Sequence, residues 1–148
     1  MADFQKFPDR TPFGKNVYLR STHPKPRMES YTFAKDGIPV EVVDGSDQKV
    51  LQPGTAIARI TSGPDAGKVG VFDSGAADGR EDVANLVGVN DTFLPWQLLE
   101  RDVDIAVTYD AVCVLNWCYM YAAGVRATLD QATADEMRNK SHMDLMFV

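Results

Sequence analysis

A run of glycines and aspartates between residues 63 and 82 holds the side chains that most resemble a chemical site. Its first part, residues 63–68, resembles a phosphate-binding loop, in which backbone amides cradle phosphates and a hydroxyl after the lysine holds magnesium. Such a loop has four residues between its glycines and a serine or threonine after its lysine. Here three residues separate Gly63 from Gly67, and Val69 follows Lys68, so the spacing argues against nucleotide binding.

Four carboxylates follow in the same stretch and could bind a cation: Asp73, Asp78, Glu81 and Asp82. They lack the alternating spacing and the closing glutamate of a calcium loop. Glycine and aspartate are also the residues that build tight turns between strands. We therefore interpret the stretch as a solvated turn, and we expect no metal and no cofactor.

The histidines and cysteines do not form a recognisable active site either. His23 and His142 have no partner serine or cysteine in a nucleophile turn. Cys113 and Cys118 lie five residues apart in an apolar run, and on one strand this odd spacing directs them to opposite faces. We expect two buried, unreactive thiols rather than a disulfide or a zinc site. The sequence thus predicts that the protein is not an enzyme.

The chain has 148 residues, the size of one domain, and its net charge of −6 is unevenly distributed. Residues 1–35 carry seven basic and three acidic groups, whereas the remainder carries eight basic and 18 acidic groups, a balance of −10. No apolar run is long enough for a membrane span, and the first residues have no apolar signal core, so we expect neither membrane insertion nor secretion. The asymmetry suggests two parts with different partners.

The first part, residues 1–36, is expected to be an extended arm. Five of the eight prolines lie within residues 1–39, so no helix of useful length fits between them. The arm nevertheless carries too many apolar side chains for a purely solvated tail. It could add a strand to the sheet edge of a partner, or it could wrap its own body. The contact residues that we expect are Phe4, Phe7, Phe13, Val17, Tyr18, Leu19 and Arg20.

The second part, residues 37–148, is predicted to be a compact, mostly β (α+β) body, barrel-like or sandwich-like, with one short C-terminal helix. Alternating apolar residues and glycine or proline turns indicate short strands, and the sequence Thr133 to Glu136 has the form of a capping box before a helix at 134–140. The strands are expected at residues 38–43, 55–61, 68–72, 83–89, 103–109, 112–121 and 142–148.

One short stretch, residues 60–71, resembles the KOW motif of ribosomal and transcription-elongation proteins. In that motif a glycine-rich turn joins two strands of a small barrel, so the resemblance implies an RNA-binding module. The charge of the body opposes this function, because affinity for a phosphate backbone comes from cationic contacts. A KOW-like RNA-binding barrel is kept as the alternative function.

A longer resemblance begins at residue 67 and continues to the end of the chain. It comprises a strand, the loop 72–79, the Leu-Val-Gly-Val of residues 86–89, the alternating strand 103–109, a short helix and a terminal apolar strand. In their order and spacing these elements resemble the head decoration, or cement, proteins of tailed bacteriophages, the family typified by the phage lambda head decoration protein. The chain departs from the type protein by an insertion at 92–101 and by a more aromatic arm.

The resemblance implies a structural protein of the virion, made in the host cytoplasm and bound to the outer surface of the assembled capsid. Such proteins form homotrimers at local three-fold positions and clamp neighbouring major capsid proteins of the same phage, with the N-terminal segment ordered on the shell. Neither nucleic acid nor membrane is an expected partner. The family and the surplus of apolar residues at 92–99 and 120–121 suggest a trimer interface formed by Phe93, Trp96, Leu98, Leu99 and Tyr121.

Overall fold

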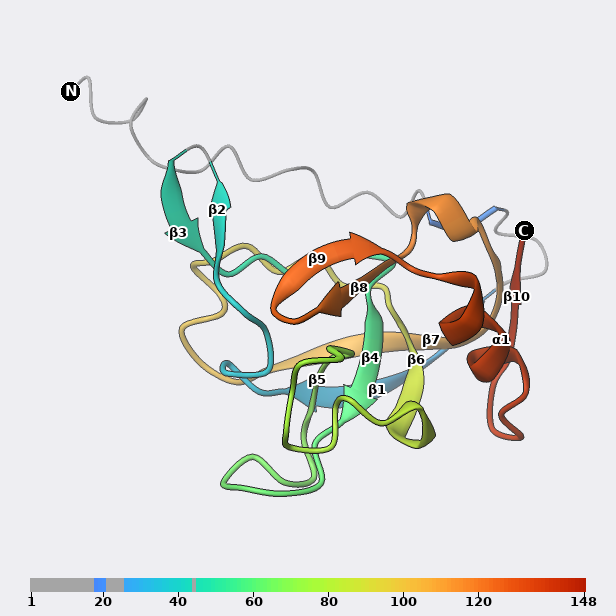
Figure 1. The fold of residues 1–148 in the computed structure, drawn as a ribbon, viewed down its shortest axis with the longest axis horizontal. Helices are drawn as coiled ribbons and strands as arrows, with labels where there is room; N and C mark the ends of the chain where they lie inside the picture. Colours follow the sequence, from blue (N-terminus) through green and yellow to red (C-terminus); the bar gives the residue numbers. More distant parts are fainter. Residues whose placement is uncertain (1–17, 21–25, 44) are drawn as a thin grey trace.

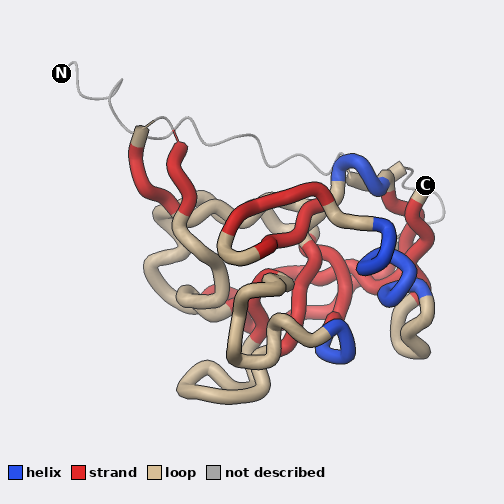
Figure 2. The backbone as a smooth tube through the Cα atoms, in the orientation of Figure 1, coloured by secondary structure: helices blue, strands red, loops and turns tan. Residues whose placement is uncertain are grey.

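The computed structural model describes residues 18–20, 26–43 and 45–148 (Figure 1, Figure 2). It confirms the predicted mostly β fold with one short helix near the C-terminus. The strands are β1 (Arg27–Phe33), β2 (Glu41–Val43), β3 (Ser46–Gln48), β4 (Ala56–Arg59), β5 (Val69–Val71), β6 (Leu86–Asn90), β7 (Val103–Cys113), β8 (Tyr119–Ala122), β9 (Val125–Thr128) and β10 (Asp144–Phe147), and the helix is α1 (Gln131–Arg138).

In the described part of the chain, five strands close a barrel in the order β1-β5-β4-β6-β7, and β7 pairs back to β1. The β1–β7 pair is antiparallel along the whole of β1, whereas β1 meets β5 in parallel through one residue pair, Phe33 with Val69. The terminal strand β10 runs parallel to the last four residues of β7, and Asp110 pairs both with Asp144 of β10 and with Arg27 of β1. The long strand β7 is therefore shared by several pairings, whereas the barrel closes between β1 and β5 through a short seam.

Side-chain alternation along the strands builds two apolar clusters. One cluster takes residues from all five barrel strands and is therefore the barrel interior. Its strand residues are Phe33, Ile57, Val69, Val71, Val87, Ile105 and Val107. On β4 the neighbours of Ile57, Ala56 and Ala58, face the other way, as the alternation in the sequence predicts.

The second cluster lies outside the barrel, where β8, α1 and β10 cover the outer face of β4, β6 and β7 (Figure 1). On the covering side it contains Met120, Ala134, Met137, Leu145 and Phe147, all buried. Burial of each large apolar side chain contributes about 1.5–3 kcal/mol, so this layer supplies a substantial part of the stability. The C-terminal elements are thus part of the core of the body.

The seam between β1 and β5 depends on two glycines whose backbones touch. A Cβ atom on Gly70 would lie 2.6 Å from the carbonyl oxygen of Gly37 and 2.8 Å from its Cα atom. That same oxygen accepts the amide of Val71 at 2.8 Å and the Nη1 of Arg80 at 2.9 Å. The absence of side chains lets the segment after β1 lie directly on β5, which closes the barrel where strand pairing is sparse.

The prediction of a central strand at 112–121, separate from the strand at 103–109, is wrong. Strand β7 continues without interruption to Cys113, and the chain then reverses through the 3-10 helix η3 (Leu115–Trp117) before β8 begins. The two cysteines are free and buried, as expected, but they do not face opposite ways: both belong to the outer cluster, and the pKa of Cys118 is raised by its hydrogen bond with Cys113 and by burial. The turn places their side chains together.

The expected boundary between arm and body at residue 36 is also wrong, because β1 is a barrel strand whose residues pair with β7 from Arg27 to Phe33. Prolines at 24, 26 and 39 flank this strand without interrupting it, which is where a strand tolerates proline. A smaller difference lies at Val83–Asn85, which form the 3-10 helix η2 instead of the start of β6.

The helix begins three residues earlier than the capping box predicts. Asp130 is the N-cap, and its carboxylate accepts the amide of Thr133 at 2.7 Å, so Thr133 is a buried residue of the first turn. A carboxylate at this position satisfies an amide that has no partner inside the helix and favours the positive end of the helix dipole.

Replacing Asp130 with alanine is expected to lower the free energy of unfolding by about 1 kcal/mol, because one helix amide loses its acceptor. The matched control is Glu136→Ala, the exposed residue that the capping box would have assigned to the cap, with an expected change within about 0.5 kcal/mol. Urea unfolding of both variants measures the difference. Equal losses, or a larger loss at Glu136, would contradict this assignment of the cap.

Candidate functional site

Of the predicted arm residues, Phe4, Phe7, Phe13 and Val17 lie outside the described residues, and the next three form a short extended segment on the body. Leu19 pairs antiparallel with Cys113 at the end of β7. The amide of Val114 donates to the carbonyl of Tyr18 at 2.6 Å, and the amide of Arg20 donates to that of Val112 at 2.9 Å. The segment makes one antiparallel β-bridge to a strand end, the kind of pairing that the sequence suggested for a docking arm, but the strand belongs to its own chain.

Tyr18 is fully buried in the outer cluster. Its hydroxyl donates to the Asp91 carboxylate at 2.6 Å and lies 3.0 Å from the hydroxyl of Thr108, which donates in turn because the phenol has one proton. Burial, followed by the hydrogen bond to Asp91, raises the pKa of Tyr18 well above its usual range. The ring rests against Gly54, where an added Cβ would lie 2.9 Å from the Cβ of Tyr18.

These contacts correct the expected role of Tyr18. Its side chain is enclosed by its own body and cannot also fill a pocket of a partner. Leu19 is partly buried against the outer cluster, whereas Arg20 is exposed. Tyr18 therefore anchors the segment 18–20 on the body.

Three exposed apolar side chains lie on the elements next to this segment, and the sequence reasoning did not identify them. Trp117 on η3 and Met146 and Val148 on the terminal strand are each half-exposed. Backbone hydrogen bonds tie these elements together: Leu115 donates to the carbonyl of Val148 at 3.0 Å, and Val148 donates to that of Cys113 at 2.9 Å. We call Trp117, Met146 and Val148 the root patch. Alternation along 144–148 was the available signal, because Leu145 and Phe147 fill the core and direct their neighbours outward.

The predicted trimer-interface residues separate into two groups. Leu99 and Tyr121 are buried with the barrel-interior cluster, so neither exposes its side chain on the surface, although Leu99 also lines a pocket. Phe93 and Trp96 are partly exposed and Leu98 is exposed, on the inserted segment between β6 and β7. An open pocket of about 420 Å³ lies there; it is lined by Lys35, Asp36, Val40, Asp47, Gln48, Lys49, Trp96, Leu99 and Glu100.

The four carboxylates between residues 73 and 82 each bind an amide or an arginine of their own chain. Asp73 accepts the amides of Gly75 at 2.8 Å and Gly124 at 3.3 Å, which ties this loop to the β8–β9 hairpin. Asp78 pairs with Arg80 at 3.0 Å, and Glu81 and Asp82 accept the amides of Gly79 and Ala84, each at 2.9 Å. Within the described ranges, no group of three or more histidine, cysteine or acidic residues is arranged to hold a metal ion.

The loop at 63–68 forms the turn of the β4–β5 hairpin. The amide of Gly67 donates to the carbonyl oxygen of Ile60 at 2.9 Å, and the amide of Ile60 donates to the carbonyl oxygen of Lys68 at 2.9 Å. The Lys68 ammonium binds Asp102 at 2.6 Å and Asp65 at 3.1 Å, and these hydrogen bonds raise its pKa. The lysine that suggested a phosphate loop therefore joins this turn to the start of β7.

Comparisons with protein-family models, with curated proteins and with solved structures gave no match to this chain. None of the helices in the part of the chain that the structure describes has the length and apolar character to cross a membrane.

Replacing Tyr18 with phenylalanine is expected to lower the free energy of unfolding by about 1–3 kcal/mol, because Asp91 and the buried Thr108 lose a hydrogen-bond partner. The control is Tyr31→Phe, whose hydroxyl donates to Glu29 in an exposed position, with an expected change within about 0.5 kcal/mol. Urea unfolding measures both. A Tyr18 variant as stable as the Tyr31 variant would show that the Tyr18 hydroxyl makes no net contribution to the free energy of unfolding.

Stability is also expected to fall at alkaline pH. Burial is the main cause that raises the pKa of both Tyr18 and Tyr121, and the negative charge of Glu41 adds to the effect on Tyr121. Above about pH 10 the unfolded chain loses these protons while the folded chain keeps them, so each tyrosine lowers the free energy of unfolding by about 1.4 kcal/mol per pH unit. Urea unfolding at pH 9, 10 and 11 measures the slope. An unchanged stability from pH 9 to 11 would refute the prediction.

Proposed function

We propose that this protein is a head decoration protein of a tailed bacteriophage. It binds the outer surface of the assembled capsid as a trimer at local three-fold positions and clamps neighbouring major capsid proteins. Support comes from the order of the elements that carry the resemblance, which lie as β5, β6, β7, α1 and β10 in one small β-barrel body. The protein is made in the host cytoplasm and acts on the virion surface without a catalytic step, a cofactor or a membrane.

The observation that carries the proposal is the position of the segment 18–20. Its backbone is tied to the end of β7 and its tyrosine is anchored in the outer cluster, directly beside the root patch. The described residues nearest the N-terminus thus lie next to the elements on which Trp117, Met146 and Val148 expose apolar surface. An anchored arm root beside apolar side chains suits a protein whose function is adhesion to a surface.

The energetics follow from the number of contacts. Each arm aromatic that becomes buried on the shell contributes on the order of 1.5–3 kcal/mol, less the cost of ordering the chain. The basic groups of the arm increase the rate of association with an acidic shell more than they increase the affinity. A trimer carries three arms, so the first contact holds the other two at high local concentration, which multiplies the affinity by about 10²–10⁴.

The alternative function, a KOW-like RNA-binding module, has one observation in its favour. Residues 60–71 lie in the β4–β5 hairpin of a five-stranded barrel, with both turn glycines at positive φ angles. The excess of ten acidic groups in residues 36–148 opposes it. Binding to single-stranded RNA that weakens steeply with added salt would favour this alternative over capsid decoration.

Deleting residues 2–17 is expected to lower binding to expanded capsids of the encoding phage at least about a hundredfold, because the arm contacts and their avidity are lost. The free energy of unfolding should be retained, since Tyr18 remains. Deleting residues 2–20 is the matched comparison: it also removes the anchor, so it should destabilise the body as well. Co-sedimentation with capsids and urea unfolding provide the two measurements.

Two results would contradict the proposal. The first is full-length protein that does not bind capsids of the encoding phage. The second is a 2–17 deletion that decorates these capsids with unchanged occupancy, which would place the adhesive contacts elsewhere on the chain. Loss of binding together with loss of folding in the 2–17 deletion would contradict the assignment of Tyr18 as the root of the arm.

A further inference from the structure

The end of the molecule opposite the root patch carries a second surface that is both raised and hollowed. The β2–β3 hairpin projects there, while β10 and the C-terminus lie at the other end (Figure 1). The raised part is the hairpin, and the hollow is the pocket of about 420 Å³ at its base. We call the two together the hairpin face.

The hairpin presents an apolar ridge on this face. Val40 lines the pocket just before β2 begins, and Val42 is the middle residue of that strand. Val42 also stands directly opposite Asp47, another pocket residue, in the β2–β3 register. Val42 is 70% exposed. Its sheet has only two strands, and such a hairpin is marginally stable in water by itself, so further apolar burial of Val42 would stabilise it.

The hollow has an apolar wall formed by the inserted segment. Trp96 and the buried Leu99 line the pocket, and the adjacent Leu98 is exposed. The indole Nε1 of Trp96 is buried and has no hydrogen-bond acceptor among the described residues, which is unusual for a native tryptophan. Apolar side chains and an unsatisfied donor beside a cavity indicate a surface that is incomplete in the isolated chain.

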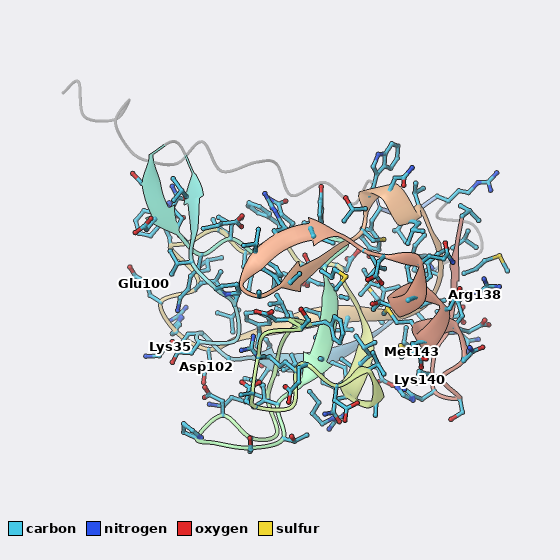
Figure 3. All side chains as sticks on the ribbon, in the orientation of Figure 1. Lys35, Glu100, Asp102, Arg138, Lys140 and Met143 are labelled. Atoms are coloured by element: carbon cyan, nitrogen blue, oxygen red, sulfur yellow. The ribbon has the colours of Figure 1, made fainter. Side chains whose placement is uncertain are left out.

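The charged rim of the hairpin face carries both signs. Lys35, Asp47 and Glu100 line the pocket, and within the described residues none of their side chains takes part in an ion pair. Figure 3 shows Lys35 and Glu100 at the hairpin end of the molecule. Because this rim carries one cation and two anions without an ion pair, the rim of a second copy can supply the opposite charge.

We propose that the hairpin face is the contact between copies of this chain, with the Val40–Val42 ridge of one copy seated against the Trp96–Leu99 pocket of the next. A raised element that meets a different, hollowed element makes a head-to-tail contact, and such contacts close into rings with cyclic symmetry. This inference rests on the proposed function for its stoichiometry of three. It leaves the root patch, at the other end of the molecule, available for the shell.

The test compares Val42→Asp with Val125→Asp. Val125 is the matched control, since it is 67% exposed and lies on the other two-stranded hairpin, β8–β9. Wild type and Val125→Asp are expected to sediment as trimers at micromolar concentration, whereas Val42→Asp sediments as a monomer. Circular dichroism and urea unfolding of both variants establish that the body is folded. Wild type that is monomeric at 100 μM, or Val42→Asp that remains trimeric, overturns the inference.

A charge exchange tests the register of the contact. Lys35→Glu and Glu100→Lys are each expected to weaken trimer formation at least about tenfold, because each places like charges together, and the double variant should recover most of the loss. A double variant that forms trimers more weakly than either single variant would overturn the proposed pairing of Lys35 with Glu100 across the contact.

Capsid co-sedimentation separates this inference from the function on which it rests. If wild type forms trimers through the hairpin face but does not bind capsids, the proposed function fails and the inference stands. If wild type decorates capsids while Val42→Asp stays trimeric, the inference fails and the function stands.

Discussion

The fold depends on one strand, β7, to which most of the remaining structure is hydrogen-bonded. Its eleven residues pair with β1, β6 and β10 and with Leu19 of the segment 18–20. Residues from the beginning, middle and end of the chain therefore meet on a single strand. Such non-local pairing must overcome a large loop-closure entropy before the contacts form, so the barrel and its outer layer are expected to fold together.

Much of the fold could be predicted from alternation in the sequence, because barrel strands with two different faces leave a period of two. Residues 55–61 and 103–109 show this pattern: the first range contains the whole of β4, and the second forms most of β7. The run 112–121 does not, since it is apolar throughout, and periodicity cannot distinguish one buried strand from two strands and a tight turn. The reversal at η3 was for this reason invisible, and with it the proximity of Cys113 and Cys118.

The candidate surfaces were harder to predict because burial depends on which partner an apolar residue finds. Tyr18 has the composition and context of a docking residue, yet its own body provides Asp91, Thr108 and the space beside Gly54. Leu99 is buried and Leu98 is exposed, although the two are adjacent and identical in type. Only the turn at 95–99 decides between them, through the hydrogen bonds from Leu98 to Pro95 and from Leu99 to Trp96.

The anchoring of Tyr18 limits the maximum distance that the residues before it could span from the body. An arm that began at residue 36 could extend at most about 120 Å from the body, whereas the seventeen residues before Tyr18 can span at most about 60 Å. Halving the maximum reach reduces the accessible volume roughly eightfold. Under the proposed function, each arm would therefore reach only shell subunits next to its own body, and the arms of neighbouring trimers would compete less for the same sites.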